Sequence, residues 1–149
     1  MTFELGTDGP TAILVAVDDS RTANRAAWYA AGLARRQRAR LISVYVAPIA
    51  SAAAASPGGA TLLAAESQAR DEMAADMRER AEAGAKEFGV EITFIAAHGD
   101  AFSEINRLAD ETRADAIVVG ASEKAGHRLI GSLAVRLVRA GKWPVTVVP

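Results

Sequence analysis

Two consecutive aspartates, Asp18 and Asp19, directly follow the apolar run at residues 12–17. Carboxylates at the end of a buried strand can bind a metal ion or the hydroxyl groups of a ribose. Together with Ser20, however, they are also the residue types that cap the N-terminus of a helix. The sequence supports these two interpretations about equally.

A second stretch that could do chemistry lies between Gly120 and Gly131. Gly120 ends the apolar run at residues 116–119, and Gly131 with Ser132 opens a helical pattern. A buried strand, a glycine turn and a helix N-terminus form a place where backbone N–H groups can face a phosphate. The basic residues of the loop, which could also face an anion, are Lys124, His127 and Arg128. Taken alone, the stretch is explained more simply as an ordinary strand-to-helix connection.

Several other kinds of site have no signature in the sequence. There is no Walker A motif, no Gly-x-Gly-x-x-Gly after the first apolar run and no Gly-x-Ser-x-Gly. A standard dinucleotide site and a hydrolase nucleophile are therefore not indicated. His98 and His127 have no local partner at metal-ligand spacing, so we expect surface residues and no metal site. The absence of cysteine excludes disulfides and thiol chemistry.

The composition indicates one globular domain. The chain has 149 residues, of which half are hydrophobic, and a net charge of −1. This length suits a single domain, and the charge gives no reason to expect a nucleic acid or an anionic membrane as partner. Residues 1–10 lack the features of a signal peptide, and no apolar run approaches the roughly 20 residues of a membrane span. We therefore expect a soluble cytoplasmic protein.

Strands and helices must alternate along the chain to position these residues. The pattern predicts strands at 12–17, 41–46, from 90 to the turn at Gly99-Asp100, 115–120 and 145–148, and helices at 20–38, 62–88, from 102 and at 131–140. Such an alternation predicts one α/β domain, in which helices cover both faces of a parallel sheet. Ligands of such sheets bind beyond the carboxyl ends of the strands. The residues at these ends are Asp18, Val46, His98 and Gly120.

The pattern also predicts some finer features. Residues 1–11 are expected to be a loose lead-in, and the Ala-, Ser-, Pro- and Gly-rich residues 48–60 a mobile loop. Alternating polarity over residues 90–94 places the third strand at a sheet edge. The apolar face predicted for the long second helix consists of Ala69, Met73, Met77, Ala81 and Ala85. Its methionines are interpreted as core residues.

Taken together, several segments resemble the universal stress protein family over nearly the whole chain. They are residues 13–20, 44–46, 114–120, the pair Gly131-Ser132, the closing segment 144–148, and Gly99 before the third helix. The closing segment is the most specific. The resemblance implies a five-stranded parallel sheet in the order 3-2-1-4-5, Rossmann-like and of the nucleotide-binding α-hydrolase type. It also implies a homodimer.

Some members of this family bind ATP, and the resemblance transfers their binding positions to this chain. Asp18 and the backbone of Val46 would hold the nucleoside of ATP or AMP. The phosphates lie on a loop of the form Gly-x-x-Gly, nine residues, then Gly-Ser or Gly-Thr. The positions of this loop that complete the candidate site are Gly120, Ser122, Arg128, Gly131 and Ser132.

The chain departs from this loop pattern in two ways. Glu123 stands in place of the middle glycine, and seven residues instead of nine separate it from Gly131. Glycine lets the backbone approach a phosphate, whereas glutamate adds a negative charge beside a polyanion. At ~4 Å and an effective dielectric constant of about 20, one such pair costs roughly 4 kcal/mol before screening. We therefore expect ATP binding to be weak or absent.

These observations imply a homodimeric stress-response binding and signalling protein with a degenerate nucleotide-binding loop. The alternative is a functional ATP- or AMP-binding member of the family. At most a weak ATPase activity is expected, because no general base or nucleophile is identifiable. A phosphorylated receiver domain is disfavoured because residues 94–97 contain no aspartate to accept the phosphate.

The homodimer is expected to form through residues 145–148, which are short, β-branched and uncharged. An edge strand of this kind exposes unpaired backbone groups that a second copy can satisfy. The alternative is that residues 1–11 fold over this edge and keep the chain monomeric.

Overall fold

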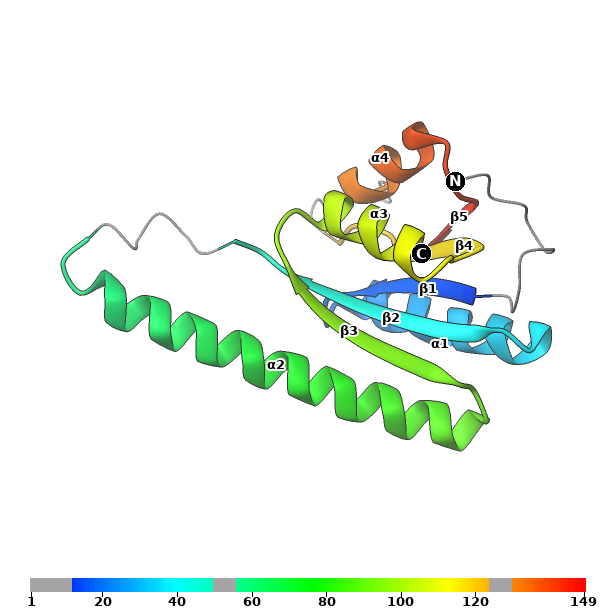
Figure 1. Cartoon of the computed structure of the whole chain (residues 1–149), viewed down its shortest axis with the longest axis horizontal. Helices are drawn as coiled ribbons and strands as arrows, with labels where there is room; N and C mark the ends of the chain where they lie inside the picture. The colour runs from blue at the N-terminus through cyan, green and yellow to red at the C-terminus, as the bar shows by residue number, and fades with distance from the viewer. Residues whose placement is uncertain (1–11, 50–55, 124–129) are drawn as a thin grey trace.

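The fold is a regular alternation of strands and helices, as the hydrophobic pattern predicts. The computed structural model describes residues 12–49, 56–123 and 130–149. In chain order the elements are β1 (Ala12–Val17), α1 (Arg21–Gln37), β2 (Arg40–Ala47), α2 (Gly59–Phe88), β3 (Ile92–His98), α3 (Ala101–Glu111), β4 (Ala116–Gly120), α4 (Ser132–Ala140) and β5 (Val145–Val148) (Figure 1). The strands form one sheet in the order β3-β2-β1-β4-β5, and every neighbouring pair is parallel. This order and the edge position of β3 confirm the prediction.

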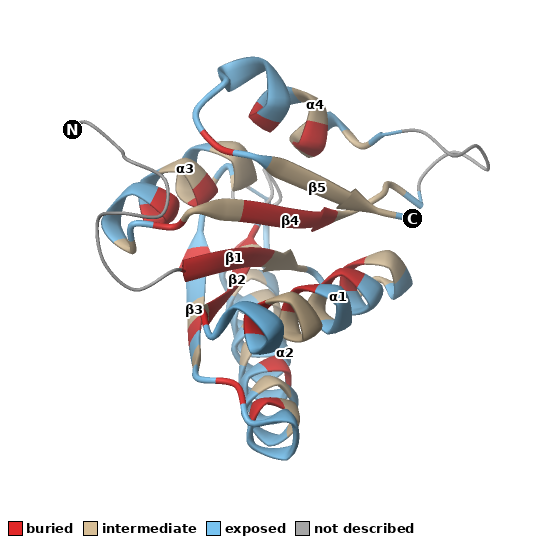
Figure 2. Cartoon of the chain, turned by 90° about the vertical axis from the view of Figure 1, so that its right-hand side faces the viewer, coloured by how far each residue is buried: buried red, intermediate tan, exposed pale blue. Residues whose placement is uncertain are grey.

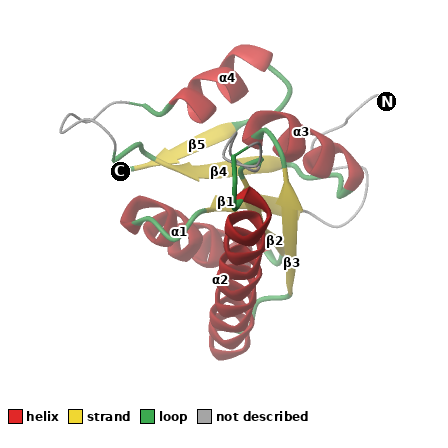
Figure 3. Cartoon of the chain, turned by 90° about the vertical axis from the view of Figure 1, so that its left-hand side faces the viewer, coloured by secondary structure: helices red, strands yellow, loops and turns green. Residues whose placement is uncertain are grey.

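Helices cover both faces of the sheet. Helices α1 and α2 lie on one side, and α3 and α4 lie on the other (Figures 1 and 3). Neighbouring residues of β1 face opposite sides, since Ile13 packs in the core cluster that contains α1 and Leu14 packs in the cluster that contains α3 and α4. Both side chains are almost completely buried, which explains why this strand is apolar along its length (Figure 2).

Alanines on one side of α1 let this helix lie close to the sheet. Its buried residues are Ala23, Ala26, Ala30 and Ala34. Ser20 is the N-cap, and its Oγ accepts a hydrogen bond from the amide of Ala23 at 3.1 Å. This bond satisfies one of the first amides of the helix, which have no partner within it.

Helix α2 corrects two of the predictions. Met77 and Ala85 are buried as expected, but Met73 is 41% exposed and Ala69 is exposed as well. A helix of 30 residues is about 45 Å long, whereas the seven residues of β3 span about 23 Å. The N-terminal part of α2 therefore extends beyond the sheet and has no core to enter (Figure 1).

The start of α2 also changes the predicted loop. The helix begins at Gly59, so the last two residues of the segment 48–60 are helical. Residues 50–55 of that segment, and the lead-in at residues 1–11, lie outside the described part of the chain. None of the helices in the described ranges is long and apolar enough to cross a membrane.

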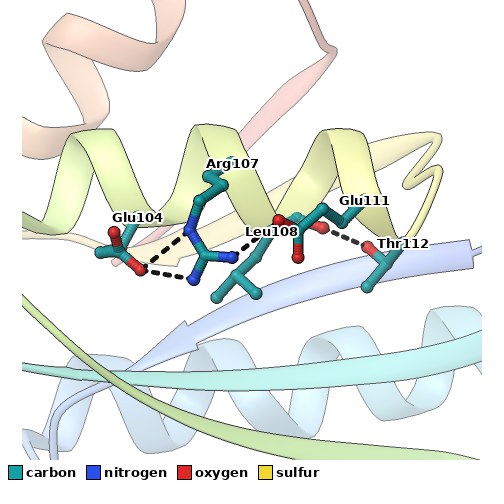
Figure 4. A network of polar contacts seen from close by, with 5 residues as sticks. All are labelled: Glu104, Arg107, Leu108, Glu111 and Thr112. Carbon is teal, nitrogen blue, oxygen red and sulfur yellow. Dashed lines mark hydrogen bonds and ion pairs between the residues drawn. The ribbon is translucent and has the colours of Figure 1, made fainter.

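Side-chain ion pairs and hydrogen bonds stabilise α3 and connect its N-cap to α4. Within α3, Arg107 forms ion pairs with Glu104 at 2.6 Å and Glu111 at 2.7 Å (Figure 4). Asp100 is the N-cap, and its Oδ2 accepts a hydrogen bond from the amide of Ser103. Arg136 of α4 binds both oxygens of the same carboxylate, at 3.0 and 3.3 Å. Asp100 thus has a structural role.

Candidate functional site

A cavity of about 430 Å³ lies where the carboxyl ends of β1, β2 and β4 meet α1 and α4. It is lined by every candidate residue that the structure describes, namely Asp18, Val46, Gly120, Ser122, Gly131 and Ser132. Arg128 belongs to residues 124–129, which lie outside the described part. The fold therefore brings together residues from three separate parts of the sequence. His98, also at a strand end, is exposed and does not line the cavity.

The two aspartates after β1 differ in their surroundings. Asp18 lines the cavity, and its Oδ1 accepts a hydrogen bond from the amide of Ser20 at 3.0 Å. Asp19 has a left-handed backbone with φ of 65°, and its Oδ1 accepts a hydrogen bond from Arg80 of α2 at 2.8 Å. Because Ser20 is the N-cap, neither aspartate caps α1 directly. Only Asp18 is placed to meet a ligand in this cavity.

Gly120 is needed for packing as well as for its place in the loop. A Cβ atom added to Gly120 would lie 2.6 Å from the carbonyl carbon of Thr22 and 2.7 Å from the amide nitrogen of Ala23. Real Cβ atoms do not approach backbone so closely, so the end of β4 and the first turn of α1 can meet only at a glycine. This reason for a glycine holds whether or not a phosphate binds.

The N-terminus of α4 faces the cavity. Gly131 is the N-cap and provides no side-chain hydrogen bond to the helix. The lining continues through the first turn, with Ser132, Leu133 and Ala134. The first amides of a helix lack intrahelical partners, and they and the helix dipole favour an anion at this end. The hydroxyl group of Ser132 adds a hydrogen-bonding group at the same place.

Glu123 also lines the cavity and is bound to α1. Its Oε1 accepts a hydrogen bond from the amide of Thr22 at 3.0 Å. The hydroxyl group of Thr22 donates to the carbonyl oxygen of Ala121 at 2.6 Å. These two bonds join the segment after β4 to the first turn of α1. The carboxylate thus places a negative charge at the N-terminus of α1, where such a charge is stabilising.

The electrostatic character of the cavity follows from these residues. Over the described part of the lining, Asp18 and Glu123 are the charged side chains, and both are acidic. The other polar side chains are the hydroxyl groups of Ser20, Thr22, Ser122 and Ser132. Within the described ranges no group of three His, Cys, Asp or Glu residues could hold a metal ion. Hydroxyl groups, carboxylates and backbone amides suit the binding of a polar ligand.

Sequence reasoning placed Glu123 in the loop but missed Thr22. The sequence does show that Thr22 carries a hydroxyl group two positions after the N-cap Ser20, where a side chain can form hydrogen bonds beyond the end of the helix. Nothing in the local sequence states that the partner of this residue is more than one hundred positions away.

A parallel sheet in the order β3-β2-β1-β4-β5, with a cavity between its carboxyl edge and a helix N-terminus, defines a Rossmann-like α/β protein. The model of the universal stress protein family matches residues 11–149, and the chain belongs to that family.

Individual relatives agree with this assignment. Universal stress protein MJ0531 from Methanocaldococcus jannaschii is 28% identical over 138 residues, which cover 91% of this chain and 80% of the relative. A universal stress family protein from Burkholderia pseudomallei is 30% identical with a TM-score of 0.71, covering 93% of this chain and 96% of that one. UspA from Lactobacillus plantarum is 27% identical with a TM-score of 0.80, covering 95% and 100%.

Two further structures of the same fold were solved with nucleotides. One universal stress protein, in complex with cAMP, is 23% identical with a TM-score of 0.65 and covers 95% of this chain and 98% of its own. The Archaeoglobus fulgidus protein, in complex with dAMP, is also 23% identical, with a TM-score of 0.62, and covers 93% and 98%. At this identity the likeness establishes the fold.

Proposed function

We propose that this protein is a homodimeric stress-response binding protein whose cavity binds adenine nucleotides with one phosphate better than it binds ATP. The observation that carries the proposal is the position of Glu123. Its carboxylate lines the cavity beside the segment after β4 and is held there by the amide of Thr22. The proposed function is binding and signalling. Turnover of ATP is not expected, because no general base or nucleophile is identifiable.

The part of the cavity nearest the sheet supports binding of a nucleoside. Asp18 presents a carboxylate that can accept hydrogen bonds from ribose hydroxyl groups, and Val46 offers an apolar side chain and backbone. Universal stress proteins that share the fold have been solved with cAMP and with dAMP, each of which carries one phosphate. The N-terminus of α4 can accept a single phosphate.

A triphosphate meets a less favourable environment. Its phosphates carry several negative charges, whereas the described lining contributes the carboxylates of Asp18 and Glu123. The bond from Thr22 stabilises the charge of Glu123 but does not remove it. Glu123 is exposed, so salt reduces the repulsion without abolishing it. The segment from Glu123 to Gly131 is also two residues shorter than the family pattern.

Calorimetry of the purified protein with adenosine, AMP and Mg-ATP tests the proposal. AMP should bind more tightly than adenosine, because the N-terminus of α4 can bind its phosphate. AMP should also bind more tightly than Mg-ATP, because the carboxylate of Glu123 repels the additional phosphates. A dissociation constant for Mg-ATP in the low micromolar range, about −8 kcal/mol, would contradict weak triphosphate binding. If none of the three binds, the proposal for nucleotides is wrong and an interaction module without nucleotide replaces it.

The edge position of β5 supports the homodimer. β5 pairs with β4 on one side only, and all four of its residues are half-buried. The strand carries no charge, although charges commonly protect an exposed edge. Antiparallel pairing of two β5 strands would satisfy their outer backbone groups around a two-fold axis. Residues 1–11, which could cover this edge instead, lie outside the described part.

A further inference from the structure

A second cavity lies on the opposite face of the sheet, between the strands, α1 and α2. Its volume is about 310 Å³. The walls are mostly apolar, with Val15 and Phe94 on the sheet, Trp28 on α1 and Met77 on α2. Ligand cavities in proteins have volumes of roughly 300–1,000 Å³ and predominantly apolar walls. The size and lining of this cavity therefore suit a small molecule.

Small residues on the helices leave this space open. Ala31 of α1 and Ala81, Gly84 and Ala85 of α2 all line it. A Cβ atom added to Gly84 would meet no other atom within 4 Å. Packing therefore does not require a glycine here, although glycine makes a helix less stable than alanine does. The helix α2 thus keeps an open wall where a larger side chain would fit.

Ser43 gives the cavity one buried polar group. It lies on β2 beside Val15 of β1 and Phe94 of β3, and it is only 3% exposed. Over the described ranges it is the one polar residue that is buried, and it lines this cavity. A hydroxyl group can donate one hydrogen bond and accept two, and buried polar groups are normally hydrogen-bonded. A ligand in the cavity could bond with it.

The polar end of the cavity limits the charge of the ligand. Asp19, Asn24 and Arg80 line this end. Arg80 forms ion pairs with Asp19 at 2.8 Å and with Asp76 at 2.9 Å, so two carboxylates compensate its charge. The arrangement offers no excess positive charge to an anion. This distinguishes it from the N-terminus of α4, which favours an anion in the first cavity.

We propose that the cavity between α1 and α2 binds a neutral, mainly apolar molecule with one hydroxyl or carbonyl group that bonds with Ser43. A dry cavity of roughly 150 Å³ accommodates benzene, so about twice that volume suits a molecule of two fused rings. This site lies on the opposite face of the sheet from the first cavity, although Val17 at the end of β1 lines both.

The test uses 2-naphthol and 2-methylnaphthalene, which differ by a hydroxyl in place of a methyl group. The chain is labelled with ¹³C in the methyl groups of its three methionines. Met77 lines the cavity, whereas Met73 of the same helix is exposed and does not. Because aromatic rings shift nearby methyl resonances, both probes should shift the Met77 signal saturably and leave Met73 unchanged.

Four variants locate the site. Gly84→Leu should fill the cavity and weaken both probes at least tenfold, whereas Ala83→Leu, on an exposed part of the same helix, should have no effect. Ala81→Leu is a second way to fill the cavity if Gly84→Leu does not fold. Ser43→Ala should weaken 2-naphthol roughly fivefold, as for one lost hydrogen bond, and leave 2-methylnaphthalene unchanged.

Absence of a saturable Met77 shift with either probe up to its solubility limit would overturn the proposal. So would equal binding by the parent and the filled variants. An equal effect of Ser43→Ala on both probes would show that the polar contact is not Ser43 and that the proposed ligand class is wrong.

Discussion

The amide of Thr22 donates a hydrogen bond to Oε1 of Glu123 at 3.0 Å, although the two residues are 101 positions apart in the chain. Glu123 therefore has two effects that the sequence could not separate. It joins the segment after β4 to α1, and it places a negative charge in the cavity. Different substitutions at this one position can remove either the charge alone or both.

Glu123→Gln should increase the affinity for Mg-ATP by roughly tenfold. The glutamine side chain is almost the same size, and its carbonyl oxygen can still accept the bond from Thr22. The charge near the phosphates is lost, and one like-charge interaction of this kind is worth a few kcal/mol before screening. Calorimetry of parent and variant in the same buffer measures the change. An unchanged affinity would mean that the charge is not the obstacle.

Glu123→Gly separates charge from loop length. If the charge is the obstacle, this variant also binds Mg-ATP more tightly than the parent. If the two missing residues of the loop are the obstacle, neither variant does. Glu123→Gly should also lower the free energy of unfolding by about 0.5–1.5 kcal/mol relative to Glu123→Gln, because the bond to Thr22 is lost. Urea unfolding of the two variants gives this difference directly.

Gly120→Ala should destabilise the fold by about 1–3 kcal/mol, even without any ligand. The added Cβ would lie within 2.8 Å of three backbone atoms of α1, so the helix or β4 must shift. Gly131→Ala is the matched control, because its Cβ would approach only the side chain of Ser122 closely, at 3.3 Å. It should cost less than ~1 kcal/mol in urea unfolding. Equal losses would contradict the packing role of Gly120.

The strands of the sheet could be predicted from the local hydrophobic pattern, whereas their order was implied by the family resemblance. Residues 12–17 are apolar at every position, and the structure shows why, since Ile13 and Leu14 are buried on opposite faces of β1. The ends of β1 and β4 follow from the same pattern, so the sequence places Asp18 and Gly120 at one edge of the sheet. Their convergence on one cavity is a consequence of parallel topology.

Other features depend on distances that no local pattern records. The period of α2 marks an apolar face, but it does not say where along the helix the core ends, and Met73 is 41% exposed. The sequence indicates Gly120 as part of a phosphate loop but not its contact with Thr22. That contact depends on how closely α1 approaches β4, which no local pattern specifies. The cavity beside Ser43 likewise results from the spacing of two helices.

The contact between Asp100 and Arg136 should make stability depend on pH below about pH 4. Hydrogen bonds from Arg136, and then from Ser103, lower the pKa of Asp100 from 3.8 to about 2. Folding therefore favours the ionised carboxylate. Its contribution is complete above pH 4 and is lost as the pH falls from about 4 to 2. Arg136→Gln should reduce this pH dependence, as measured by urea midpoints between pH 2 and 6.

The matched control for this prediction is Arg139→Gln, an exposed arginine on the same helix. It should leave the slope between pH 4 and 2 unchanged. Glu104, whose pKa is lowered by Arg107, contributes to the same slope in parent and variants alike. An Arg136→Gln variant with the parent's slope would show that the ion pair does not set the pKa of Asp100.

The outer edge of β5 underlies the last prediction. Val147 pairs with Val119 of β4 on its inner side and is half-buried against the core that includes α3 and α4. In an isologous dimer each Val147 would lie near its own copy across the two-fold axis. A charge at this position would then be present twice at a short distance, where like charges on facing strands are destabilising.

Val147→Lys should accordingly shift the protein from dimer to monomer in sedimentation velocity experiments. Val138→Lys adds the same charge to an exposed position of α4 and should leave the dimer intact. Val147→Thr removes part of the packing of Val147 without adding a charge, so it too should remain dimeric if strand pairing is intact. Far-UV circular dichroism establishes that each variant is folded. A monomeric parent, or a Val147→Lys variant that stays dimeric, would contradict pairing through β5 and favour coverage of this edge by residues 1–11.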